Sequence, residues 1–230
     1  MRWALFLLCF ALGLAGRRVA ADEAPALGGD GRATNLVANG GFEEADPGDP
    51  RRPFRWELPD GLGVRWEEAP DGEGRAIALD TSIPEVDMVE SWRRAGLSDS
   101  WDIPDPAGNA IAETYGLSYY SDAFPVVSGQ TYRVSCRVRG GSSAKVWVRG
   151  YGMFRGTMRR RYEAVMSVSP APEEWRSASL VFHPTRARPD VAEVRVMLYA
   201  YYPPAVTWFD DVRVEPFDES SGGDAGPVAQ

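Results

Sequence analysis

The sequence is poor in the residues that most often form covalent links or carry out covalent chemistry. Its 230 residues include two cysteines and one histidine. Cys9 stands in the apolar segment at the N-terminus, so only Cys136 remains in the body of the chain. A single cysteine cannot form a disulfide within the chain. A domain of this length must therefore be held together by a hydrophobic core.

Neither Cys136 nor the histidine, His183, is expected to be catalytic. Cys136 alternates with apolar residues in "YRVSCRV", which is typical of a small buried side chain. His183 stands in "FHPT" at the end of a predicted strand, where we expect a surface position. The sequence contains no Gly-x-Ser-x-Gly, no His-Glu-x-x-His and no phosphate-binding loop. These absences favour a protein that is not an enzyme.

No apolar run in the sequence is long enough to span a bilayer. The longest lies within residues 1–21, where one arginine near the start is followed by about a dozen apolar residues. Small residues follow at Val19 and Ala21. This pattern predicts a signal peptide over residues 1–21 and a secreted or periplasmic location.

The rest of the chain predicts one β-rich domain, residues 34–217, between a flexible leader at 22–33 and a disordered tail at 218–230. The domain shows short alternating runs bounded by Gly, Pro, Asn and Asp, which predict an all-β sandwich or barrel. The clearest runs are 74–80, 117–126, 131–140, 144–154, 174–183, 191–202 and 206–216, and two weaker ones are 35–44 and 64–70. Residues 81–116 are irregular, with room for a short helix around "EVDMVESWRRAG".

Charge is distributed unevenly along the chain. Removing residues 1–21 takes away three of the 25 basic residues and none of the 33 acidic ones, which leaves a net charge of −11. Residues 131–162 nevertheless contain nine basic residues and no acidic one. This stretch forms either the solvated faces of strands or an anion-binding sheet surface. An acidic chain without recognisable nucleic-acid motifs is not expected to bind nucleic acid.

Three segments, in order along the chain, together carry a family resemblance. They are "NLVANGGFEEADPGDPRRPFRWELPDG", "YYSDAFPVVSGQTYRVSCRVRG", and "EEWRSASLVFHPT" followed by "VRVMLYAYYPPAVTWFDDVRV". The series resembles the carbohydrate-binding modules of families four, nine and twenty-two, which are galactose-binding-like jelly rolls. The resemblance implies a jelly-roll β-sandwich over nearly all of residues 35–216. It does not fix sugar binding, because one fold serves many functions.

The last segment contains two adjacent aspartates inside a predicted strand, "WFDDVRV" at 208–214. Strict alternation would place Trp208, Asp210, Val212 and Val214 on one face of that strand. This face is apolar, so Asp210 is expected to point into the core. A bare buried carboxylate is costly, so Asp210 needs a partner.

The family resemblance supplies such a partner, a structural calcium between the first and last strands. The matching positions are Glu43 and Asp210 as carboxylate ligands, with backbone carbonyls from around Gly41 and Gln130. Calcium takes six to eight oxygen ligands, and two carboxylates would neutralise it. The alternative is that Asp210 accepts hydrogen bonds from backbone amides or a tyrosine.

The strands at 131–140, 144–154 and 191–202 each have one apolar face and one face rich in arginine and aromatic residues. If these strands are neighbours, their outer faces form one surface, on which Met197 is also expected. The candidate ligand-binding residues on it are Arg137, Trp147, Arg149, Tyr151, Tyr199 and Tyr201. Aromatic rings stack on sugar rings, and guanidinium groups bind hydroxyls or carboxylates, which favours an acidic polysaccharide. Alternatively, the 81–116 segment folds over this surface and buries it.

Two other functions remain open from the sequence. A jelly-roll glycoside hydrolase or polysaccharide lyase would need two carboxylates about 5–10 Å apart in a cleft. The candidates for such a pair are Asp87, Glu90, Glu113 and Asp122. A structural or adhesion module that binds protein is the other alternative. The favoured prediction is a monomeric, non-catalytic carbohydrate-binding protein with a structural calcium.

Overall fold

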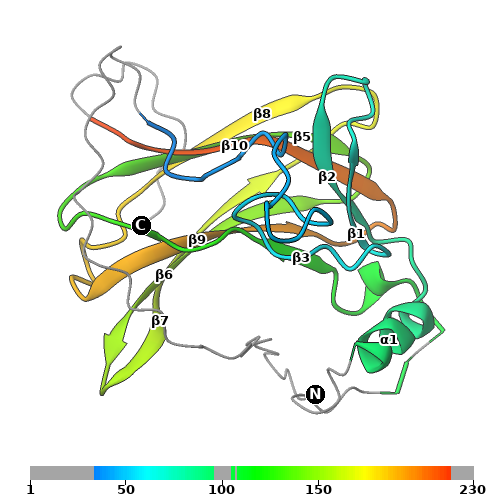
Figure 1. The fold of residues 1–230 in the computed structure, drawn as a ribbon, viewed down its shortest axis with the longest axis horizontal. Helices are drawn as coiled ribbons and strands as arrows, with labels where there is room; N and C mark the ends of the chain where they lie inside the picture. The colour runs from blue at the N-terminus through cyan, green and yellow to red at the C-terminus, as the bar shows by residue number, and fades with distance from the viewer. Residues whose placement is uncertain (1–33, 96–104, 107, 219–230) are drawn as a thin grey trace.

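The computed structural model describes residues 34–95, 105–106 and 108–218. The predicted signal peptide and leader lie outside the described residues, as does all of the predicted tail except Asp218. The described residues form two antiparallel sheets that face each other as a sandwich (Figure 1). The predicted all-β jelly-roll sandwich is confirmed.

The first sheet has the strand order β1–β2–β10–β5–β8. Its strands are β1 (Val64–Glu68), β2 (Arg75–Asp80), β10 (Val206–Pro216), β5 (Tyr132–Gly140) and β8 (Arg176–Phe182). The second sheet has the order β3–β9–β6–β7, with β4 also paired to β9. Its strands are β3 (Leu117–Tyr120), β4 (Phe124–Pro125), β6 (Ala144–Phe154), β7 (Thr157–Val168) and β9 (Val191–Ala200).

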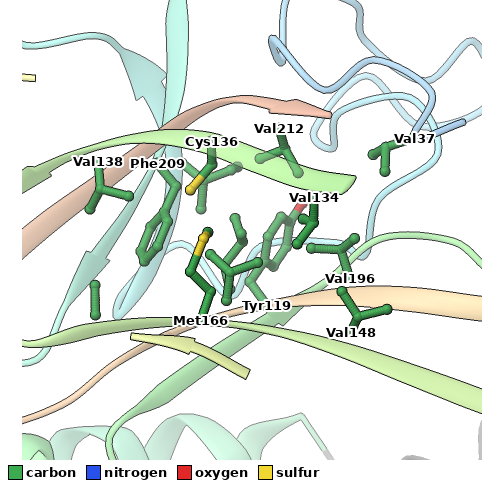
Figure 2. Close-up of a cluster of buried hydrophobic side chains, with 14 of the residues drawn as sticks. Val37, Tyr119, Val134, Cys136, Val138, Val148, Met166, Val196, Phe209 and Val212 are labelled. Carbon is green, nitrogen blue, oxygen red and sulfur yellow. The ribbon is translucent and has the colours of Figure 1, made fainter. Parts of the chain in front are cut away.

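The core lies between the two sheets and follows the apolar alternation of the sequence. Along β5 the residues are alternately buried and half-buried, and the buried set begins with Tyr132 and Val134. Phe209 and Val134 of the first sheet face Met166 and Val196 of the second, respectively (Figure 2). Period-two alternation gives each strand one core face, so burial of that face stabilises the strand and its register together.

Residues 35–44 do not form the predicted strand. They form turns instead, and Asn39 and Phe42 have positive φ. Two backbone hydrogen bonds link the segment to β10, from Leu36 to Val214 and from Val212 to Gly40. The side chain of Asn35 adds two more: its Oδ1 accepts the N–H of Val214, and its Nδ2 donates to the carbonyl of Val212. Asparagine side chains can replace backbone hydrogen bonds in this way, which is why they favour turns over strands.

The alternation also failed to reveal β7. Only the second half of this strand alternates, with Ala164, Met166 and Val168 buried, whereas its first half is mostly exposed. β7 is joined to β6 by the two residues Arg155 and Gly156, both with positive φ. Two such residues form the tight turn that suits the twist of a hairpin.

The predicted short helix is confirmed as α1 (Glu85–Arg94). Its Met88 and Val89 are buried, and Met88 and Leu117 both lie against Gly63. α1 therefore packs at one end of the sandwich (Figure 1). A short 3-10 helix, η2 (Ile111–Glu113), follows it. Among the described residues, no helix has the length and apolarity needed to cross a bilayer.

Candidate functional site

The outer face of the second sheet carries a row of aromatic and basic side chains. We call it the aromatic–basic face, and its members are Tyr120, Lys145, Trp147, Arg149, Tyr151, Arg195, Tyr199 and Tyr201. The register of β6 and β9 brings the row together, because Lys145 lies opposite Tyr199 and Arg149 lies opposite Arg195. The core face of the same strands is apolar, so alternation leaves these side chains pointing outward.

Cations and rings alternate along this face. The Lys145 ammonium lies 5.0 Å from the ring centre of Tyr201 and 5.9 Å from that of Trp147. The Arg149 guanidinium lies 5.6 Å from the Trp147 ring and 5.7 Å from the Tyr120 ring. Each contact lies within the range of a cation–π interaction, so the rings and cations hold one another in place.

The arginines of the face are further fixed by acidic neighbours. Arg195 donates to Glu57 at 2.9 Å, and Arg149 donates to Glu163 at 3.1 Å. Burial raises the pKa of Glu57, although Arg195 opposes that shift. Lys145, in contrast, has no ion-pair partner in the part of the chain that the structure describes. Lys145 is therefore the uncompensated cation of the face.

The tyrosines at one end of the face form a second fixed group. Tyr199 and Tyr201 stack with their ring centres 5.6 Å apart. The Tyr199 hydroxyl donates to the carbonyl of Tyr115 at 2.8 Å, and the Tyr115 ring meets that of Trp92 on α1 edge-on. The 81–116 segment thus contacts the border of the face through Tyr115. The segment's residues 96–104 and 107 lie outside the described residues.

Trp147 occupies the middle of the face and carries an unusual donor. Its indole nitrogen is buried and has no hydrogen-bond partner within the described residues. An unmet buried donor costs about 1–3 kcal/mol. Buried donors without a partner are rare in native structures, and they are expected mainly at functional sites.

Five of the six predicted ligand-binding residues share this face, and Arg137 does not. The expectation that β5 neighbours β6 and β9 was wrong, because β5 lies in the first sheet. Met197, expected to be exposed, is only 4% exposed. The sequence interpretation also missed Tyr120, although "LSYY" carries the signal: Tyr119 is buried, and its neighbour Tyr120 must point the other way.

The prediction that Asp210 points into the core was wrong. A β-bulge between Asp210 and Arg213 interrupts the alternation of β10, and Asp211 has a φ of +50°. Phe209 faces the core before the bulge, and Val212 faces it afterwards. The signal for the bulge was the three-residue spacing between these two apolar side chains, where a regular strand requires two.

Asp210 lies on the outer face of the first sheet, yet it is only 7% exposed. Its Oδ1 accepts the N–H of Asp211, and its Oδ2 lies 3.9 Å from the Arg137 guanidinium. Burial, the main cause, raises the pKa of Asp210 to about 6. The charges of Asp211 and Glu43 add to this rise, and Arg137 opposes it. The ionised form of Asp210 is therefore less favourable than that of a carboxylate in water, despite the nearby Arg137.

The first segment of the domain brings Glu43 and Gly41 to the same place. Glu43 accepts the N–H of Arg75 at 2.9 Å, and its charge acts on Asp210. A Cβ at Gly41 would lie 3.9 Å from the carboxylate of Asp211. The two predicted carboxylate ligands, Glu43 and Asp210, are thus neighbours in space.

Gln130 is a wrong assignment for the same metal site. It precedes Tyr132, which pairs with Pro216, whereas Asp210 pairs with Arg137. Seven residues of extended chain from 130 to 137 span roughly 23 Å. No carbonyl of Gln130 can therefore reach an ion held by Asp210.

The remaining candidate ligands, Glu43, Asp210 and backbone carbonyls near Gly41, offer the oxygen atoms that calcium binds. The described residues contain no group of three or more His, Cys, Asp or Glu side chains that could hold a metal. Calcium does not require one, since it accepts two carboxylates completed by backbone carbonyls and water. One oxygen of Asp210 already accepts a backbone N–H, as does one oxygen of Glu43. The second oxygen of each is the candidate ligand.

Comparison with known proteins places the fold. An arabinose-bound GH51 α-L-arabinofuranosidase aligns with a TM-score of 0.50 at 15% identity, over 82% of this chain and 27% of that one. Carbohydrate-binding modules are also among the solved structures to which the chain is similar. A family 16 carbohydrate-binding module aligns at TM-score 0.46 and 15% identity, over 78% of this chain and 99% of that one. The CBM22-1 xylan-binding domain of Paenibacillus barcinonensis Xyn10C aligns at a TM-score of 0.44 and 10% identity, over 80% of this chain and 95% of that one.

Sequence comparison finds no relative of this chain. No protein-family profile matches it, and no curated protein matches it. The three solved structures named above are 10–15% identical to it, so their likeness concerns the fold alone. They include both carbohydrate-binding modules and an enzyme, so the structural likeness does not distinguish binding from catalysis.

The carboxylates considered for a hydrolase do not form a pair in a cleft. Asp87 and Glu90 lie on α1, and Glu113 lies on η2, all three exposed. Asp122 lies after β3 and pairs with Arg55 at 3.6 Å. The described residues include two cavities of about 520 and 230 Å³, and of the four carboxylates only Asp122 lines either of these two.

His183 is buried rather than exposed, contrary to the sequence expectation. It is 9% exposed at the end of β8, and its Nδ1 lies 2.9 Å from the Thr131 hydroxyl. The strand end is covered because Thr131 and Thr185 lie in loops at the same edge of the sandwich, where Thr185 also accepts the N–H of Gly129. His183 thus has a structural role.

Proposed function

We propose that this protein is a secreted, non-catalytic carbohydrate-binding module that binds a polysaccharide on the aromatic–basic face. The observation that supports this is the alternating row of rings and cations on the outer side of β6 and β9. Rings of this kind stack against the C–H faces of sugars, and the cations flank them with hydrogen-bond donors. A sheet surface suits a long chain, because it offers several subsites in a line.

The charge of the face favours an acidic polysaccharide. Glu57 and Glu163 offset Arg195 and Arg149, while Lys145, the single lysine of the chain, lacks an ion-pair partner among the described residues. A uronate carboxylate or a sulfate placed between Tyr201 and Trp147 would meet this ammonium. An acidic ligand would thus provide the negative partner that Lys145 lacks among the described residues.

The test is titration calorimetry with polygalacturonate, a sulfated glycan and neutral xylan. We expect binding of an acidic polymer that weakens with added salt. Trp147→Ala should weaken it at least about tenfold, which corresponds to about 1.4 kcal/mol. Trp175→Ala is the matched control, because this half-buried tryptophan lies at the start of β8 in the other sheet. Equal losses in both variants, or no binding of any glycan, would reject the proposed face.

We also propose that a structural calcium joins the first segment of the domain to β10. Glu43 and Asp210 would hold it, with carbonyl oxygens near Gly41. The support is the excess of negative charge around Asp210, which Arg137 offsets only in part. The ion would supply the missing positive charge and tie together two parts of the chain far apart in sequence.

A further inference from the structure

The β6–β7 hairpin extends past the rest of its sheet (Figure 1). The pairing of β6 with β9 ends at Gly152 opposite Val191, so beyond this point β6 has only β7 as a neighbour. The end of the hairpin is a two-stranded ribbon in which Met153 pairs with Met158 and Phe154 pairs with Thr157. Residues 153–159, which we call the hairpin tip, are all exposed.

The hairpin tip exposes apolar side chains on both of its faces. Met153 is 57% exposed, Met158 44% and Phe154 42%. Paired residues of a ribbon point to the same face and successive residues to opposite faces. The two methionines therefore share one face, and Phe154 lies on the other. Within the described residues, these three side chains are not buried in any hydrophobic core.

The hairpin tip is also basic. Arg155 and Arg159 have no ion-pair partner within the residues that the structure describes. Arg160 and Arg161 follow them and are paired with Glu163 and Asp190. The chain as a whole carries a net charge of −8. The hairpin tip thus projects from an acidic protein and carries both exposed apolar side chains and positive charges without ion-pair partners among the described residues.

We propose that the hairpin tip docks into the surface of an anionic phospholipid bilayer. A protein partner would meet one face of a ribbon and leave the other in water, whereas the bilayer interface surrounds the tip. Phe154 and the methionines would enter the interface, and Arg155 and Arg159 would contact lipid phosphates. The anionic surface repels the rest of this acidic protein, and this repulsion orients the molecule so that the hairpin tip faces the membrane.

This docking leaves the Lys145 end of the aromatic–basic face free, although Tyr151, at the other end of the face, is only two residues from Met153. Met153 and Lys145 are eight residues apart on β6, which is roughly 26 Å along the strand. The inference does not rest on the proposed polysaccharide binding, and either can fail without the other. A module docked in this way would hold its glycan close to a membrane.

The experiment is co-sedimentation of the whole chain with lipid vesicles. One vesicle is pure phosphatidylcholine, and the other mixes phosphatidylcholine with phosphatidylglycerol. We expect binding to the anionic vesicle only. F154S/M158S and R155Q/R159Q should each lower it at least about tenfold, because the first removes the apolar side chains that enter the interface and the second removes the charges that attract anionic lipid. All four positions are exposed, so circular dichroism should show an unchanged fold.

Trp147→Ala is the matched control and should bind vesicles like the wild type. Equal binding to both vesicles, or no binding, would overturn the proposal. So would a hairpin double variant that keeps vesicle binding but loses polygalacturonate, which would make the tip part of the glycan site. A dimer that sedimentation equilibrium finds in the wild type and not in the double variants would assign the tip to a second copy of the chain.

Discussion

Asp210 and Arg137 face each other from paired strands on the outer side of the first sheet, with Asp210 Oδ2 3.9 Å from Arg137 Nη1. The pair is not balanced, because the same guanidinium also lies 3.2 Å from Asp211 and 3.7 Å from Asp71. One cation thus serves three carboxylates, and Glu43 adds a fourth negative charge. This imbalance is the physical basis for the first two predictions.

Calcium removal should destabilise the protein. Chelation with EDTA should lower the melting temperature by several degrees, and added Ca²⁺ should restore it, because a ligand that binds only the folded state stabilises that state. Asp210→Ala should abolish the response to both treatments. Differential scanning calorimetry measures the effect. Melting curves that coincide with and without EDTA would remove the proposed calcium.

In EDTA, stability should depend on pH through Asp210. Its pKa rises from 3.8 to about 6 on folding, so between these values the folded state holds a proton that the unfolded state has released. Stability should therefore fall as the pH rises from about 4 to about 6. Asp210→Asn should flatten this slope and gain up to about 2 kcal/mol at neutral pH. Urea unfolding at a series of pH values tests this, and parallel profiles would contradict it.

Cys136 should be inert in the folded protein. Burial raises the pKa of its thiol to about 12, so almost no thiolate is present at neutral pH. A thiol-reactive disulfide reagent should label Cys136 in urea and leave it unmodified under native conditions. The absorbance of the released thiol gives the rate. Rapid native labelling would mean that the first sheet opens near the middle of β5.

Asn35 should contribute more to stability than a loop residue usually does. It bonds two backbone groups of β10, at Val212 and Val214. Asn35→Ala should lower the free energy of unfolding by about 2–3 kcal/mol, because both groups lose their partners. Asn35→Asp keeps the acceptor and loses the donor, so its loss should be smaller. A denaturant titration that ranks the two variants in the opposite order would contradict this role.

Glu163→Gln should strengthen binding of an acidic polysaccharide. Glu163 accepts hydrogen bonds from both Arg149 and Arg160, each at 3.1 Å, and so offsets their charge. A neutral glutamine would leave Arg149 available to the ligand and raise the potential of the aromatic–basic face. Glu173→Gln in the exposed loop before β8 is the control for net charge. Calorimetry should show a several-fold gain for the first variant only; an equal gain in both would mean that net charge alone is responsible.

The strands whose bounds the sequence predicted well have one buried and one outer face over most of their length. The runs at 144–154 and 206–216 match β6 and β10 in their bounds. β7 was missed because its first half projects into solvent and has no buried face. The 35–44 run has apolar residues at suitable positions, but it turns at Asn39 and Phe42 and meets β10 through two backbone bonds and the side chain of Asn35.

The candidate site was predictable in its residue types and less so in its grouping. Trp147, Arg149 and Tyr199 come together because β6 and β9 pair, as their outer faces suggested. Arg137 has the same pattern around it and lies in the other sheet. The number of tyrosines and arginines in a strand does not predict which strand pairs with it.

The sequence by itself determined which side chains of each regular strand are buried, because alternation is a property of a single extended chain. Only the tertiary structure decided which strands are neighbours and where β10 breaks its alternation, since pairing depends on contacts between residues far apart in the chain. Asp210 shows the difference. Its local pattern pointed inward, and the bulge that accommodates the first segment of the domain turned it outward, beside Arg137.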